Sequence, residues 1–252
     1  MKTLKKGICM IELKKFVGTE RLFTYKVAHD GGSAPNPFHG LCTLAICKPA
    51  IRRVAKKGDV IVGLGCGKED ESRIIYCMVV DEVVSWAGYI EGCKLGKLAG
   101  TNLNNHQNLK GKIPENENDQ GDCIWTDPID FSDSLVSWSG HEGEYDFNRD
   151  IKNGENVLIG ETYWYFGKGD KHKIRLLGDL KNIIPGRGHR SNSNNRFSEQ
   201  FVDFFNKQLI ERNITALGKM GTPALEPKKT DRQTCSRYRT EERESDAYGE
   251  DS

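Results

Sequence analysis

Two residue types with acid–base chemistry stand in neighbouring motifs near the middle of the chain. Asp122 lies in the stretch GDCIW, and His141 ends the stretch SWSGH. A carboxylate and an imidazole that meet can orient and activate a hydroxyl group or a water molecule. The alternative is that Asp122 caps a turn and that the tryptophans of both stretches belong to the core. The sequence leaves both interpretations open.

The stretch GRGHR, residues 186–190, offers a second set of candidates. Its glycines let the backbone approach a ligand, Gly188 among them, while Arg187 and Arg190 can each grip phosphate oxygens through two hydrogen bonds. His189 lies between these cations, which disfavour its protonated form, so a neutral acid–base role is expected. Alternatively, the stretch is a solvated turn whose arginines pair with nearby carboxylates.

Two further segments carry side chains suited to a nucleotide. Asn36, in the proline-stiffened loop APNPFHG, has a paired donor and acceptor that match a base edge, although an asparagine before a proline also commonly begins a turn. Lys48 and Arg52 lie on the basic face of the predicted helix KPAIRRVAKKGD and could contact phosphates. That face could equally be no more than the solvated side.

The sequence predicts neither a metal nor a cofactor. No pair of histidines or cysteines has ligand spacing, and the phosphate-binding and dinucleotide fingerprints are missing. There are 8 cysteines without a C-x-x-C pair, as expected of a reduced, intracellular protein. Cys42, Cys47 and Cys77 stand in apolar stretches, where free cysteine behaves as a small hydrophobic residue. These three are therefore predicted to be core residues.

Regular elements that could position these candidates follow from hydrophobic periodicity and from glycine and proline boundaries. In the strand NVLIGETYWYFG, Tyr163 and Tyr165 should point to one side, with Trp164 and Phe166 on the other. One of those sides is expected to face the core, and the other could line a pocket. The predicted strands are residues 21–28, 60–65, 73–86 and 156–167, and the predicted helices are residues 48–59 and 197–212.

Two segments lack a clear period. Residues 92–120 are rich in Asn, Gly and Lys and are predicted to form a long polar loop. Residues 215–252 are charged and too poor in apolar side chains to order themselves, so one domain is expected over residues 1–214, followed by a disordered tail. No apolar run approaches a membrane span, and a cytoplasmic location is expected.

Four stretches, in order, resemble a known family: APNPFHGLCTLAICKPAIRR with KGDVIVG, GDCIW followed by SWSGH, NVLIGETYWYFG, and GRGHR. Together they are similar to the nucleotide modification associated domain of the second type, over roughly residues 20–210. That family occurs in bacteria and phages and is linked by genomic association to hypermodification of DNA bases. The chain departs from the family pattern in its longer 92–120 segment and in Gly160, where a serine is expected.

The resemblance implies a protein that handles a nucleotide or a DNA base in a base-modification or phage-conflict setting, as a modifying enzyme or its accessory. The alternatives are a non-catalytic sensor of a modified base and a scaffold whose tail binds protein partners. The chain has 37 Lys and Arg residues and 36 Asp and Glu residues, so its net charge favours no class of binding partner. The expected fold is α+β: a small mixed β-barrel or strongly bent sheet, similar to the base-reading PUA and EVE barrels, with flanking helices.

Overall fold

The structure is a computed structural model, which describes most of the chain between residues 11 and 224. The described residues are 11–15, 20–67, 70–103, 106–115, 119–130, 141, 143–167, 172–186, 188–192 and 195–224. The predicted tail beyond residue 224 lies outside them, as does Arg187.

A mixed six-stranded sheet forms the centre of the molecule, in the order β8-β1-β3-β4-β7-β9. Strand β1 runs parallel to β3, and β7 runs parallel to β9, while the other neighbours are antiparallel. The strands are β1 (Leu22–Lys26), β3 (Val60–Leu64), β4 (Ile74–Val79), β7 (Tyr163–Tyr165), β8 (His189–Asn192) and β9 (Gly218–Lys219).

A smaller antiparallel sheet packs against it, with β6 (Asn156–Gly160) between β2 (Cys42–Leu44) and β5 (Glu82–Ser85). Both long predicted strands divide between the two sheets: residues 73–86 into β4 and β5, and residues 156–167 into β6 and β7. Each segment bends where it passes from one sheet to the other. The two bends are hydrogen-bonded to each other, because the Asp81 carboxylate accepts the N–H groups of Glu161 and Thr162 at 2.7 and 3.0 Å.

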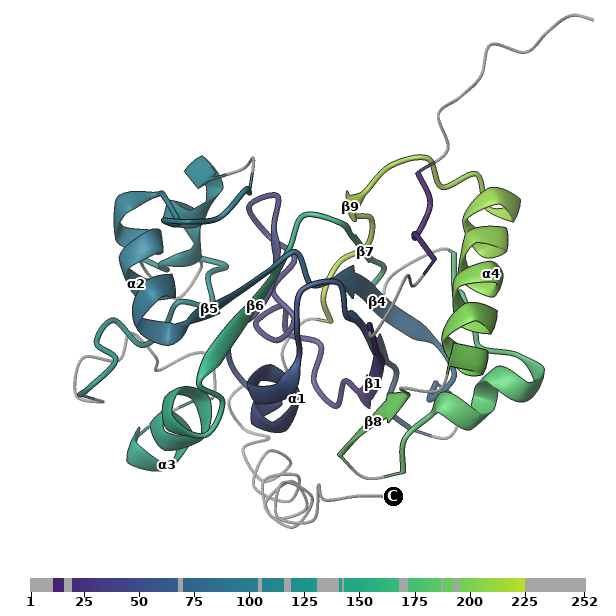
Figure 1. Ribbon diagram of the computed structural model, residues 1–252, viewed down its shortest axis with the longest axis horizontal. Helices are drawn as coiled ribbons and strands as arrows, with labels where there is room; N and C mark the ends of the chain where they lie inside the picture. The colour runs from purple at the N-terminus through teal and green to yellow at the C-terminus, as the bar shows by residue number, and fades with distance from the viewer. Residues whose placement is uncertain are drawn as a thin grey trace, which may run out of the picture.

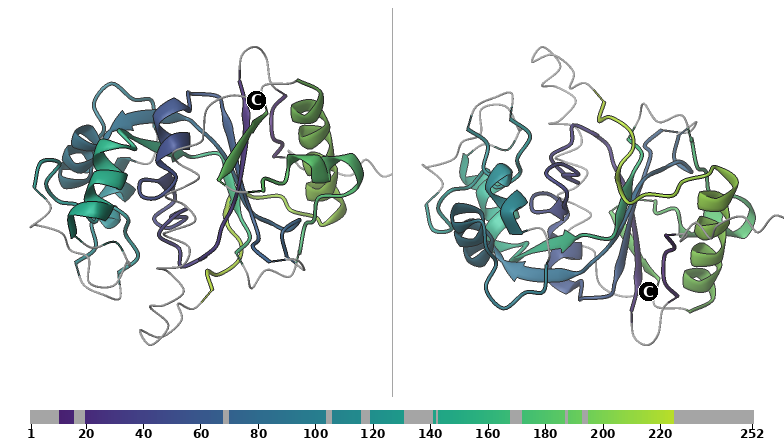
Figure 2. Two further views of the ribbon diagram at one scale, coloured as in Figure 1. Left: turned by 90° about the horizontal axis from the view of Figure 1, so that it is seen from below. Right: turned by 90° about the horizontal axis from the view of Figure 1, so that it is seen from above.

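Helices cover the outer face of each sheet, so that the molecule has four layers (Figures 1 and 2). The small sheet is covered by α2 (Trp86–Leu95), η1 (His106–Lys112), α3 (Gly143–Phe147) and the π-helical turn η3 (Asn148–Lys152), and the large sheet by η4 (Gly178–Ile183) and α4 (Asn195–Glu211). The short α1 (Pro49–Val54) follows β2 and packs between the sheets through Ile51.

Alternation along the strands divides the core into three clusters. In β6, Leu158 faces the large sheet, whereas Val157 and Ile159 face the outer helices. In β7, Tyr163 and Tyr165 face the small sheet, and Trp164 faces α4. The predicted alternation of the aromatic strand is therefore confirmed. Both of its faces are buried, because the large sheet is covered on both sides.

Three expectations need correction. The described strands form two open sheets and no closed barrel. Residues 92–120 are not simply a polar loop, because they contain the end of α2 and all of η1 and bury Leu98, Leu103 and Leu109 in the outer core. The ordered region also continues past residue 214, since β9 pairs with β7.

Candidate functional site

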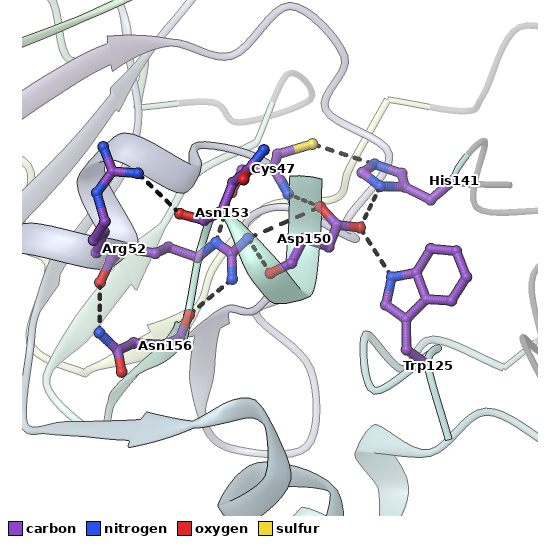
Figure 3. A network of polar contacts seen from close by, with 8 residues as sticks. Cys47, Arg52, Trp125, His141, Asp150, Asn153 and Asn156 are labelled. Carbon is purple, nitrogen blue, oxygen red and sulfur yellow. Dashed lines mark hydrogen bonds and ion pairs between the residues drawn. The ribbon is translucent and has the colours of Figure 1, made fainter. Parts of the chain in front are cut away.

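Cys47, His141 and Asp150 form a continuous line of polar contacts, although they come from segments far apart in the sequence (Figure 3). The Sγ of Cys47 lies 3.3 Å from His141 Nε2. On the other side of the imidazole, His141 Nδ1 lies 2.7 Å from Asp150 Oδ2. The line begins at a half-buried thiol and ends at a carboxylate with no exposed surface.

The chemistry of Asp150 fixes the orientation of the imidazole. An ionised carboxylate only accepts hydrogen bonds, so His141 must donate through Nδ1 and turn Nε2 toward the sulfur. Nε2 can then take a proton from the thiol or donate one back to the sulfur or a leaving group. This arrangement of nucleophile, base and orienting acid is the general form of a catalytic triad.

Charge within the line stabilises its ionised form. Burial alone would lower the pKa of His141, but the charges of Asp150 and Cys47 and the hydrogen bonds to both raise that pKa well above its usual range. Burial alone would raise the pKa of Asp150, but the charge and hydrogen bond of His141, with help from Arg52 and Trp125, lower it. His141 and Asp150 therefore form a buried ion pair beside the sulfur.

The backbone of Cys47 is held in a conformation that side-chain-bearing residues rarely adopt. Its φ of 59° is left-handed, and that of the following Lys48 is 46°. Each such residue costs on the order of 1–3 kcal/mol unless its surroundings enforce it. Here they do, because Asp150 Oδ1 accepts the Cys47 N–H at 2.9 Å and Arg52 Nε donates to the Cys47 carbonyl at 2.7 Å. The thiol is presented at a tight turn between β2 and α1.

Arg52 ties this turn to the segment that carries Asp150. Its guanidinium also donates to the carbonyls of Asp150 and Asn156, at 2.7 and 2.8 Å, and has no exposed surface. Burial lowers the pKa of Arg52 to about 10, partly opposed by the charge of Asp150. A Cβ added at Gly154 would overlap the guanidinium, so the turn needs glycine there. Arg52, predicted to bind phosphate, is thus placed as an internal brace.

The π-helical turn η3 presents Asp150, and an aromatic side chain completes its contacts. The N–H of Asn153 bonds to the carbonyl of Asn148, the wider spacing of a π-turn, which is frequent at functional sites. Trp125 Nε1 donates to Asp150 Oδ2 at 3.0 Å from the buried core. Trp125 accordingly supports the carboxylate and is not exposed for stacking on a base.

Asp122 does not contact His141, contrary to the arrangement considered from the sequence. Its carboxylate accepts the hydroxyls of Thr43 and Tyr89 at 2.5 and 2.6 Å, in a fully buried position. Burial raises the pKa of Asp122, and the charge of Lys112 partly offsets this. The partner of His141 is Asp150, a residue that the sequence did not single out.

Asn36 belongs to the same buried network as Asp122. Its side-chain oxygen accepts from Lys112 Nζ at 2.6 Å, and its amide nitrogen donates to the carbonyl of Gln120. Lys112 also donates to the carbonyl of Leu41 and to Thr43 Oγ1. These contacts use the Asn36 side chain to fix loops, and no base edge reaches it in this position.

The GRGHR stretch divides between the two faces of the large sheet. His189 pairs with Tyr25 and lies 6.2 Å from Phe23, ring to ring, on the face toward the small sheet. Arg190, the next residue along β8, lies on the other face and donates to the carbonyl of Asn182. Gly188, with a φ of 65°, precedes β8. The structure thus separates His189 from Arg190.

Cys47 is the candidate site residue that sequence reasoning missed. It was predicted to be a core hydrophobe, and Cys42 and Cys77 are indeed buried in that way. Cys47 is instead half-buried and contacts His141. The available signal was its place at a turn before the helix-starting Pro49, with a lysine beside it. Without the distant His141 and Asp150, that signal did not separate it from the other cysteines.

The part of the chain that is described contains no cluster of metal ligands and no membrane-spanning helix. There, no group of three or more His, Cys, Asp or Glu side chains could hold a metal ion. Cys47 and Asp150 contact opposite nitrogens of one imidazole and do not converge on a common point. Over the same residues, no helix has both the length and the apolar character of a membrane span.

Comparison with known proteins gives one match. The family model described as "Nucleotide modification associated domain 2" matches residues 19–224, which include Cys47, His141 and Asp150. No curated protein and no solved structure matches the chain.

Proposed function

Because this chain belongs to the nucleotide modification associated domain 2 family, we propose that it is a thiol-dependent enzyme that transfers an acyl group during modification of a nucleotide or DNA base. The single observation that carries the proposal is the contact of Cys47 with His141, backed by Asp150. A nucleophile, a base and an orienting carboxylate in this order are what acyl transfer through a covalent intermediate requires.

The reaction follows from these positions. His141 already holds the proton that comes from the thiol, and Cys47 Sγ attacks the carbonyl carbon of an ester or amide. The bond from that carbon to the leaving oxygen or nitrogen breaks, and the leaving group departs with the proton from His141. Water, or an amine of a nucleotide base, then attacks the thioester carbon and gives a proton to His141. The carbon–sulfur bond breaks, which restores the free sulfur beside a protonated His141.

A protonated imidazole beside the sulfur suits acyl transfer. Expulsion of an amine or alkoxide needs an acid that protonates the leaving atom. His141, held protonated beside the sulfur by Asp150, supplies that acid.

A generic acyl donor tests the proposal without knowledge of the natural substrate. We expect p-nitrophenyl acetate to give a burst of p-nitrophenolate equal to the enzyme present, with an acetyl group on Cys47 in the peptide map. Cys47→Ala should abolish the burst, and His141→Asn should slow it by at least about a hundredfold. An equal rate of release from wild type and Cys47→Ala would refute the proposal in favour of a binding module.

A further inference from the structure

A cationic side chain stands directly beside the nucleophile. Lys48 follows Cys47, shares its left-handed turn and is half-buried. Its Nζ lies 5.2 Å from the centroid of the Tyr25 ring, on β1 of the large sheet. Burial raises the pKa of the Tyr25 hydroxyl, the hydrogen bond with Tyr76 lowers it, and the charge of Cys47 raises it further. The Tyr25 ring therefore lies beside Lys48, the residue that follows Cys47.

His189 reaches the same ring from the neighbouring strand. It pairs directly with Tyr25 across β1 and β8, and directly paired residues project to the same face of a sheet. Lys48 and His189 therefore approach the same ring, His189 through strand pairing and Lys48 through its ammonium group. Burial lowers the pKa of His189, and the charge of Lys48 lowers it further. His189 is therefore a neutral ring that can donate one N–H group, and Lys48 supplies the positive charge.

We propose that Lys48 and His189 hold a phosphate group of the substrate beside Cys47. This inference rests on the proposed function and narrows it to acyl donors or acceptors that carry a phosphate monoester. An ammonium group and an imidazole N–H are suited to phosphate oxygens, the first through charge and the second through a directed hydrogen bond. Held there, the phosphate would place the rest of the substrate over the thiol.

Two alkylating reagents, one anionic and one neutral, test directly whether the charge of Lys48 lies beside Cys47. Iodoacetate is anionic and iodoacetamide is neutral, and both react with the same sulfur. We expect Lys48→Met to lower the ratio of the iodoacetate rate to the iodoacetamide rate at Cys47 by about three- to tenfold, the order expected from one unit charge a few ångströms away. Lys48→Arg should restore the ratio. Lys207→Met, on the exposed face of α4, should leave it at the wild-type value.

Protection by a nucleotide supplies the second measurement. Deoxythymidine 5′-monophosphate should slow alkylation of Cys47 by iodoacetamide, and thymidine at the same concentration should not. His189→Asn should raise the concentration of the monophosphate needed for half-protection by about threefold or more.

The outcomes separate the two proposals. An iodoacetate-to-iodoacetamide ratio that Lys48→Met does not change, while Cys47 still depends on His141, overturns the phosphate position alone. Equal protection by nucleoside and nucleotide overturns it as well. If Cys47 is alkylated no faster than the other cysteines, and its rate is the same in His141→Asn, the proposed function is refuted. That outcome does not depend on the result for Lys48→Met.

Discussion

The carboxylate of Asp150 accepts the main-chain N–H of Cys47 at 2.9 Å, while its second oxygen orients the base that faces the same cysteine. One buried side chain thus sets both the backbone of Cys47 and the position of the His141 ring. Mutation of Asp150 therefore combines two effects, one on stability and one on reactivity.

Asp150→Asn should lower the free energy of unfolding by about 3–5 kcal/mol, because it leaves a buried cation without its partner. The amide can also donate toward His141 and so turn the imidazole away from the sulfur. Urea denaturation followed by circular dichroism measures the first effect. A loss below about 1 kcal/mol would show that the ion pair is not formed.

His141→Asn should slow alkylation of Cys47 by iodoacetamide at neutral pH by at least about tenfold, because Cys47 loses the imidazole that can take its proton. Mass spectrometry of the digested protein gives the rate for each cysteine separately. His29→Asn, at an exposed position, is the matched control and should react like wild type. Equal rates in the His141 variant would contradict the triad.

The ion pair also predicts how stability depends on pH. The pKa of His141 is raised in the folded state, so its contribution is complete below about pH 6.5 and is lost as pH rises through the raised value. The pKa of Asp150 is lowered, so its contribution is complete above about pH 4 and is lost as pH falls through the lowered value. The difference in unfolding free energy between wild type and Asp150→Asn should therefore be largest between these limits. A difference that is flat from pH 3 to pH 9 would exclude this account.

Gly154→Ala should displace the Arg52 guanidinium and cost about 1–3 kcal/mol, the usual penalty for overpacking a filled interior. Because Arg52 also holds the carbonyl of Cys47, the alkylation rate at Cys47 should change together with stability. Gly186→Ala is the control, since a Cβ at Gly186 meets no atom within 4 Å. Similar unfolding midpoints for the two variants would argue against the brace.

Asp122→Asn should reduce the free energy of unfolding by about 1–3 kcal/mol, since an amide nitrogen replaces one of the two oxygens that accept the buried hydroxyls of Thr43 and Tyr89. The alkylation rate of Cys47 in the folded variant should match that of wild type, because Asp122 does not contact His141. A slower alkylation rate, with unchanged secondary structure, would show that Asp122 contributes to the reactivity of Cys47.

Hydrophobic periodicity in the sequence was enough to predict the strands and helices, but it was not enough to predict the contacts between them. The alternation around Trp164 and the apolar face of α4 were visible because each is set by neighbours a few positions apart. The division of residues 73–86 between two sheets was not, because a continuous apolar run does not reveal which sheet each half joins. The bend between the two halves is held by Asp81, whose partners are 80 and 81 positions away in sequence.

The same limit applies to the site. His141 was a candidate on its chemistry alone, but its partners could not be chosen from sequence. Asp122 was nearer to a recognisable motif, and Asp150 stood in a segment without one. Lys48 and Arg52 looked equivalent as basic residues of one helix. Tertiary packing separated them, since one lies beside the thiol and the other is enclosed.

The Cys47 amide and its carboxylate partner are 103 positions apart along the chain. During synthesis Cys47 therefore leaves the ribosome before Asp150 has been translated. Under the proposed function, its reactivity should appear only after the later half of the polypeptide has docked. Labelling of this one cysteine should then report when the chain has completed its fold.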